Sequence, residues 1–328
     1  MRKIILSVLI LFVAAAIGFS SMPAWVSNPY FGYSSDDYVC ASGFGRTQDE
    51  ADTEARKEIA GFFGTSVYSN TEMSASESSV TGYESSFSSA VHAKVDSDDI
   101  VGISIDRRYK ENGQYASHAI LSRRSACSYY SGQIETYAKK ITDASGYVFE
   151  DLGSMYALED LADLTDAVNR YQKSLRIYNA LSPEPYSSTL TEVPNLNPIS
   201  QQVLSSIEVS VKISGDDNGR IESAVKSFLT GCGLSVARRK ARNVVDVSIL
   251  FENTEVKGSP FKFCRYSISV SITDETFGEQ VFEFSASGRE GQNSYEQAKT
   301  RALSSVEKII GNEFADKFEE KFGLRPNK

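Results

Sequence analysis

The sequence is poor in the residues from which most catalytic and metal sites are built. Its 328 residues include two histidines, His92 and His118, one tryptophan, Trp25, and four cysteines. No C-x-x-C pair, H-E-x-x-H helix motif or G-x-S-x-G elbow occurs, which argues against zinc sites and the common hydrolase motifs. A glycosidase cleft would need aromatic walls, and the single tryptophan stands near the N-terminus. We therefore expect no enzymatic activity, no metal and no cofactor.

Long apolar runs are also scarce, and the one that occurs is at the N-terminus. Arg2 and Lys3 precede an apolar run at 4–17, which small residues follow. This order is typical of a signal peptide, and the run is shorter than the roughly 20 residues of a membrane-spanning helix. Residues 1–20 are predicted to be a signal peptide cleaved just before Ser21; an uncleaved anchor is the alternative. No cysteine follows the run closely, so a lipid-modified N-terminus is not expected.

The charge balance is acidic, with a formal net charge of −9. Wholesale binding of nucleic acid requires a basic face and is not expected. One basic cluster is present: Arg238, Arg239, Lys240 and Arg242. It is either a solvated turn between strands or a patch for an anionic partner, including the head groups of a membrane surface that the protein contacts peripherally.

Disulfides can form if the protein is exported, because exported proteins enter an oxidising compartment. The chain has four cysteines: Cys40, Cys127, Cys232 and Cys264. Four cysteines allow three pairings. Pairs Cys40–Cys127 and Cys232–Cys264 would each close a loop within one half of the chain. Buried thiols without disulfides are the alternative.

The stretch CASGFGRTQDEADTEARKEIAGFF has the outline of a phosphate-binding loop, since Gly43 and Gly45 lead from an apolar run into a predicted helix. It lacks the third glycine of a dinucleotide site and the lysine of a Walker loop. Thr47 and Glu50 form a T-x-x-E capping box, and the acidic first turns would repel a phosphate. We therefore interpret the glycines as a structural strand–turn–helix, without a nucleotide. The apolar series Ala51, Ala55 and Ile59, with Phe62 and Phe63 nearby, is predicted to give the helix one buried face.

The patterns predict an α+β protein of two small domains, each an antiparallel sheet packed by helices. The first domain is placed at 21–124, with a strand at 65–79, a helix near 83–95, and a hairpin turned by Asn112-Gly113. Trp25 is expected to hold the mature N-terminus on this domain. His118 lies in the hairpin and is expected to be solvent-facing or hydrogen-bonded within the strand rather than a general base.

The second half is joined by a helical hairpin at 125–181 and a proline-rich linker at 182–203, and the second domain is placed at 204–328. Its SGDDNGR turn looks like a calcium loop, but Val225 stands where the bidentate glutamate belongs, so we expect a turn and helix cap. Ser294 and Gln297 are predicted to cap the last helix. The buried stripe of that helix is Ala298, Ala302, Val306, Ile309, Phe314 and Phe318.

The N-terminal half resembles a known family. PAWVSNP directly after the signal peptide, a strand that ends in Gly-x-Gly, and an alanine-rich acidic helix are similar to the Lpp-twenty family of bacterial envelope lipoproteins, over about Pro23 to Ala138. The resemblance implies a small α+β module with no known enzymatic site. The family usually carries a lipid-bearing cysteine at the mature N-terminus, which this chain lacks, and the chain adds a helical insert and a second α/β domain. The membrane attachment of the family is therefore not predicted for this chain.

These observations predict a non-catalytic exported protein of the cell envelope, in the periplasm or associated with the outer membrane. Its expected partners are envelope proteins or further copies of itself, because polar strand faces and sheet edges are pairing surfaces. The alternative is a soluble periplasmic binder of a small molecule, glycan or lipid, which would require an apolar pocket between the two domains.

Overall fold

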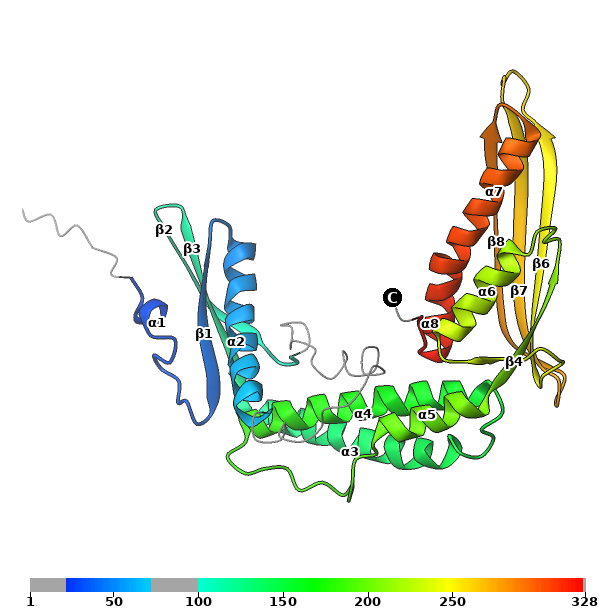
Figure 1. Cartoon of the computed structure of the whole chain (residues 1–328). Helices are drawn as coiled ribbons and strands as arrows, with labels where there is room; N and C mark the ends of the chain where they lie inside the picture. Colours follow the sequence, from blue (N-terminus) through cyan, green and yellow to red (C-terminus); the bar gives the residue numbers. More distant parts are fainter. Residues whose placement is uncertain (1–21, 72–99, 327–328) are drawn as a thin grey trace, which may run out of the picture. The chain divides into compact units, whose positions relative to one another are not determined.

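The computed structural model describes residues 22–71 and 100–326 and shows the predicted α+β class (Figure 1). Its contacts divide the chain into two compact units. Unit 1 contains Met1–Gly64 and Val95–Arg124, and unit 2 contains Thr65–Lys94 and Ser125–Lys328. The predicted hairpin helices, the linker and the second sheet therefore belong to one unit. The helix expected near 83–95 lies outside the described residues.

Unit 1 is built on a three-stranded antiparallel sheet with strand order β1-β3-β2. The strands are β1 (Tyr38–Gly45), β2 (Ser104–Glu111) and β3 (Gln114–Ser122). Asn112 and Gly113 both have positive φ, 48° and 78°, as a two-residue hairpin turn requires. The hairpin predicted from this dipeptide is confirmed.

The sheet of unit 1 is covered on both faces (Figure 1). Helix α2 (Gln48–Thr71) packs on one face, and its residues Ala51, Ala55, Ile59 and Phe63 are fully buried. The short helix α1 (Ala24–Ser27) lies on the other face. The prediction of a strand from residue 65 was wrong as far as Thr71, because α2 continues through these residues. Each residue added to a formed helix gains a hydrogen bond at little further cost.

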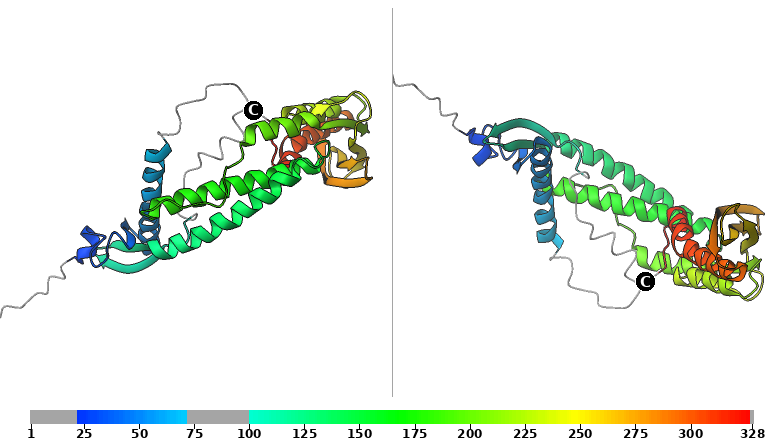
Figure 2. Two further views of the ribbon diagram at one scale, coloured as in Figure 1. Left: turned by 90° about the horizontal axis from the view of Figure 1, so that it is seen from below. Right: turned by 90° about the horizontal axis from the view of Figure 1, so that it is seen from above.

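The helices of unit 2 begin with α3 (Arg123–Tyr147) and α4 (Tyr156–Leu181), which run side by side (Figure 2). Their apolar sides enter one core together with the second sheet. The second part of the predicted linker is not a strap, because Leu196–Ser206 forms α5. The Asn195 side chain accepts a hydrogen bond from the Asn197 N–H, and Pro198 stands in the first turn, where no N–H is needed.

The sheet of unit 2 has strand order β5-β4-β6-β7-β8. Strands β6, β7 and β8 pair antiparallel as predicted, but β4 pairs in parallel with both β5 and β6. The sheet is therefore mixed: its antiparallel part was expected, and the parallel pairing of β4 was not. Helix α6 (Arg220–Gly231) follows β4 and carries the chain back over the sheet, so the next strands run in the direction of β4. The strands are β4 (Glu208–Ser214), β5 (Ser235–Val236), β6 (Asn243–Glu255), β7 (Lys262–Asp274) and β8 (Glu279–Gln292).

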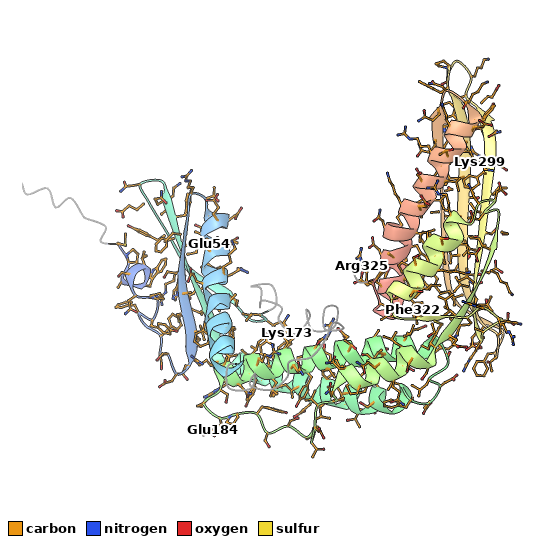
Figure 3. All side chains as sticks on the ribbon, viewed as in Figure 1. Glu54, Lys173, Glu184, Lys299, Phe322 and Arg325 are labelled. Atoms are coloured by element: carbon orange, nitrogen blue, oxygen red, sulfur yellow. The ribbon has the colours of Figure 1, made fainter. Side chains whose placement is uncertain are left out.

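The chain ends in a helical run of α7 (Tyr295–Ile309), a π-helical turn (Ile310–Phe314) and α8 (Ala315–Phe322). Lys299 and Arg325 lie near opposite ends of this run, and Phe322 closes α8 (Figure 3). Ser294 caps α7 by accepting from the Gln297 N–H, as predicted. The π turn adds one residue to the repeat, so the buried stripe continues from Ile309 to Phe314 instead of residue 313. All six residues predicted for this stripe are buried.

Candidate interaction surface

The two glycines of the strand–turn–helix serve close packing of α2 on β1. A Cβ added at Gly43 would lie 2.0 Å from the backbone nitrogen of Ala55, and one added at Gly45 would lie 2.5 Å from the Cβ of Glu50. Real Cβ atoms do not approach other atoms so closely, so only glycine fits at either position. The glycines allow the backbone of α2 to pack directly against the backbone of β1. The backbone N–H groups at the start of the helix bond to side chains of the helix itself.

The capping box predicted at this helix start is present. The Glu50 carboxylate accepts from the N–H groups of Arg46 and Thr47, and the Glu50 N–H donates to the Thr47 hydroxyl. The N–H groups of Arg46, Thr47 and Glu50 are thereby satisfied without a ligand. The structure therefore gives Gly43, Gly45, Thr47 and Glu50 the local roles expected from the sequence.

The cysteines are not joined in disulfides, so neither proposed pair forms in this structure. Cys40, Cys232 and Cys264 are buried, and Cys127 is half-buried. Burial raises the pKa of Cys40 to about 11 and that of Cys232 to about 12, because a thiolate loses its hydration there. These two thiols pack as small apolar side chains, which was the alternative to disulfides.

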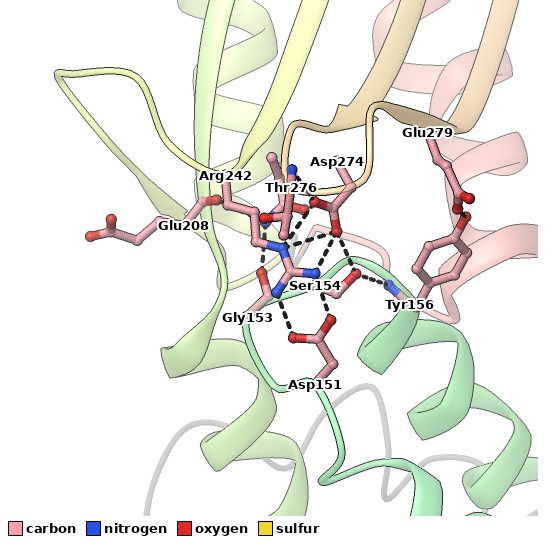
Figure 4. Close-up of polar contacts among 10 residues, drawn as sticks. Asp151, Gly153, Ser154, Tyr156, Glu208, Arg242, Asp274, Thr276 and Glu279 are labelled. Carbon is pink, nitrogen blue, oxygen red and sulfur yellow. Dashed lines mark hydrogen bonds and ion pairs between the residues drawn. The ribbon is translucent and has the colours of Figure 1, made fainter.

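The basic cluster is only partly available to a partner. Arg238 and Arg239 are exposed, but Lys240 donates to Glu275 at 2.8 Å. Arg242 is engaged more fully, because its guanidinium lies between two carboxylates (Figure 4). Its Nε is 2.9 Å from Oδ2 of Asp274, and its Nη2 is 2.5 Å from Oδ2 of Asp151. The cluster therefore does not present four unengaged cations.

The carboxylate of Asp274 is the buried centre of this network. Besides Arg242, it accepts from the Ser154 hydroxyl at 3.0 Å and from the Thr276 N–H at 2.9 Å. Burial alone would raise the pKa of Asp274, but these hydrogen bonds hold its pKa below the usual value. Asp151 and Ser154 stand between α3 and α4, so the network joins the helices of unit 2 to the ends of β6 and β7. Sequence analysis missed it, because its side chains come from positions about 30 to 120 residues apart.

The Asp-rich turn before α6 acts as the expected turn and cap. Gly215 and Gly219 have positive φ, and the Asp216 carboxylate accepts from the Glu222 N–H at 2.9 Å. Val225, which stands in place of a calcium-binding glutamate, is buried in the core. In the part of the chain that the structure describes, no group of three or more metal-ligating side chains is assembled.

His118 is buried and holds the N-terminal segment on unit 1. Its Nε2 lies 2.7 Å from the carbonyl oxygen of Pro29, and its Nδ1 lies 3.3 Å from Asp106. Its ring packs against Trp25 and Tyr33. Trp25 is also buried, and its carbonyl oxygen accepts from the Ser42 hydroxyl. The expected role of Trp25 is confirmed, and His118 is the hydrogen-bonded strand residue among the expected alternatives.

Asp52 connects α2 to the other two strands of unit 1. It accepts from Arg108 of β2 at 2.7 Å and from the hydroxyl of Ser117 on β3. The Arg108 hydrogen bond is the largest cause that lowers the pKa of Asp52 to about 2; Ser117 and Gln48 add to it, and burial opposes it. A depressed pKa means that the ionised carboxylate stabilises the folded state.

Unit 1 is therefore expected to lose stability as the pH falls from about 4 to about 2. The contribution of Asp52 is complete above the unfolded pKa of about 3.9 and disappears as the pH falls through the folded value. Urea midpoints read from the fluorescence of Trp25 at several pH values measure this loss. Asp52→Asn should flatten the acid dependence, and an identical dependence in the variant would contradict the assignment.

The outer edge of β1 is open in the part of the chain that the structure describes. The Arg123 N–H donates to the carbonyl of Asp37, and Tyr38 pairs with Ser122, so the odd-numbered residues of β1 are bonded to β3. The alternation of an antiparallel ladder then turns the backbone groups of Cys40, Ser42 and Phe44 outward. Within the described residues no hydrogen bond reaches these groups. The backbone N–H and C=O groups of these three alternate residues can therefore form hydrogen bonds with a further strand.

The two edges of this sheet differ in how they are protected. Strand β2 carries charged residues at five of its eight positions and has a bulge between Ile105 and Arg107, features that discourage strand addition. Strand β1, YVCASGFG, has no charged residue and no irregularity of register, and Phe44 is 54% exposed. The absence of charge was visible in the sequence, but that β1 is an edge strand appears only in the sheet order.

No described helix is both long and apolar enough to cross a membrane. No protein-family model matches the sequence, and a comparison with curated proteins gives no significant match. The resemblance to the Lpp-twenty family therefore stays a prediction.

The solved structures that match this chain include proteins described as secreted or as lipoproteins of bacteria. The secreted protein HP1454 of Helicobacter pylori matches 87% of this chain and 97% of its own at 13% identity, with a TM-score of 0.43. A minor lipoprotein of Acinetobacter baumannii matches 37% of this chain and 97% of its own at 13% identity, with a TM-score of 0.26. Lipoprotein GNA1162 of Neisseria meningitidis matches 31% and 97% at 15% identity, with a TM-score of 0.23. At this level of similarity, neither a family nor a function transfers to the chain.

Proposed function

We propose that this protein is a non-catalytic, exported factor of the cell envelope that binds other proteins through the open edge of β1. The observation that carries the proposal is the row of outward backbone groups at Cys40, Ser42 and Phe44 on an uncharged strand. An edge of this kind binds an extended segment through main-chain hydrogen bonds. The charged N-terminus and the apolar run that follows it support export.

The other clusters described above support a binding role more than a catalytic one. His118 is buried with both ring nitrogens engaged, and the carboxylates of Asp52 and Asp274 are neutralised by arginines. A general acid or base needs access to a substrate proton. These groups instead hold elements of the fold together, which leaves the surface of unit 1 for contacts.

Photo-crosslinking in cells tests this function. A benzophenone side chain at Phe44, beside the open edge, should capture the same envelope protein in repeated experiments, identified by mass spectrometry. The matched control position is Leu250 of unit 2, which is 55% exposed and lies on a different sheet. Capture from Phe44 but not from Leu250 is the expected result. Equal background at both positions would contradict a binding role for this edge.

A further inference from the structure

Helix α2 restricts what can be added to β1. The close approach of Ala51 and Ala55 to Gly43 places α2 directly over the strand. A second copy that paired its own β1 here would bring its α2 to within about 5 Å, the spacing of neighbouring strands. Packed helices need axes about 8–10 Å apart. The added strand must therefore carry no helix over it, which excludes pairing with the β1 strand of a second copy and favours an extended segment.

The side of α2 above the open edge is acidic. Gln48 Nε2 donates to Ser117 of β3, and Asp52 binds Arg108 of β2, so these two residues mark the inner side of the helix. Residues on the opposite side of Ala51 and Ala55 project past β1. Helical spacing places Glu50, Glu54 and Glu58 there, three carboxylates at steps of four residues, which we call the acidic flank.

The carboxylates of the acidic flank remain able to attract cations. Glu54 is paired with Lys57 at 2.7 Å, but both side chains are about half exposed, and an exposed pair of this kind is held only weakly. Glu58 is exposed. The carboxylate of Glu50 accepts two backbone hydrogen bonds.

The opposite face of the open edge is apolar. Even-numbered residues of β1 face the N-terminal segment, where Ser42 bonds to the Trp25 carbonyl and Cys40 is buried. The exposed ring of Phe44 continues this face beyond the covered part. Side chains alternate along a strand, so one side of an added strand would meet carboxylates and the other would meet Phe44.

We propose that the β1 edge binds an extended segment of another protein in which lysine or arginine residues alternate with apolar residues. This inference rests on the proposed function and names the chemistry of the partner. The segment adds as a fourth strand, its backbone pairs with Cys40, Ser42 and Phe44, and its cations lie under the acidic flank. The partner's apolar side chains pack beside Phe44.

Fluorescence anisotropy with a labelled seven-residue peptide of alternating lysine and valine tests the proposal on the full mature chain. The expected result is saturable binding that weakens with added salt. The control peptide, of alternating glutamate and valine, should bind at least about tenfold more weakly, a difference of about 1.4 kcal/mol. Equal binding of the two peptides would overturn the proposal.

Two variants place the binding at this edge. Ser42→Pro removes an outward N–H without touching the β1–β3 ladder, and edge strands tolerate such a proline. It should weaken binding of the lysine peptide at least about tenfold. Ser42→Ala is the matched control, because it loses the same hydroxyl but keeps the N–H. Equal affinities in the two variants, with both folded by Trp25 fluorescence, would overturn the proposal.

The double variant Glu54→Lys with Glu58→Lys lies on the helix surface and leaves the strand intact. It should reverse the preference, so that the glutamate peptide binds more tightly than the lysine peptide. Should Ser42→Pro fail to fold, this variant decides the outcome, and an unchanged preference would refute the role of the acidic flank. In cells, capture from Phe44 that persists in Ser42→Pro would refute the strand addition but leave protein binding beside this edge standing. Loss of all specific capture from the wild type would refute the function itself.

Discussion

Replacing Gly43 with alanine is expected to lower the free energy of unfolding of unit 1 by about 3 kcal/mol, at the upper end of the range for overpacked sites. The added methyl group would lie 2.0 Å from the Ala55 nitrogen and 2.5 Å from the Ala51 carbonyl oxygen. Both are backbone atoms of α2, so no side-chain rotation relieves the clash. The helix must move away from β1, and its apolar contacts with the sheet loosen.

Trp25 allows this effect to be measured in unit 1 alone. It is the only tryptophan of the chain and is buried against the sheet of unit 1, so its fluorescence follows the unfolding of that unit. Gly61→Ala is the matched control on the same helix, because a Cβ there meets no heavy atom within 4 Å. That variant should be neutral or gain up to about 1 kcal/mol from helix propensity. A Gly43→Ala midpoint at or above the wild type would show that the glycine is not required for packing.

Replacing Arg242 with methionine is expected to destabilise unit 2 by about 3–5 kcal/mol. Methionine preserves much of the side-chain volume but leaves Asp274 fully buried without its cation. The Ser154 hydroxyl and the Thr276 N–H remain as partners, but neither carries a positive charge. An uncompensated buried carboxylate costs far more than the loss of an exposed ion pair.

Circular dichroism during urea unfolding reports this change, because unit 2 contains most of the described helices. The fluorescence transition of Trp25 should stay in place, since Trp25 lies in unit 1. Arg239→Met is the matched control: Arg239 lies three residues earlier and is exposed, and this variant should change stability by less than about 0.5 kcal/mol. Equal midpoints for the two variants would show that the Asp274 network contributes little.

Local signals in the sequence were reliable wherever neighbouring residues settle the structure among themselves. Asn112-Gly113 turns the hairpin because both residues accept positive φ. Thr47 and Glu50 cap α2 through bonds within four residues, and Ser294 caps α7. Predictions were wrong where a segment was interpreted from its own residue pattern without the residues that come just before it. Serine-rich residues at 65–71 continue the helix that begins at Gln48. The stretch from Leu196 forms a helix because Asn195 caps its start and Pro198 stands in the first turn, where no N–H is needed.

The sequence by itself determined the α+β class, the local caps and turns, and the use of Gly43 and Gly45 in the strand–turn–helix, because these depend on residues close together in the chain. Only the tertiary structure decided that β4 runs parallel to its neighbours, that Arg242 is bound by Asp151 and Asp274, and that β1 is an open edge under an acidic helix. Strand order and ion pairs across about 30 to 90 residues are set by how the elements pack. A hydrophobic periodicity predicts one helix or strand at a time, so it does not show which other elements that helix or strand packs against.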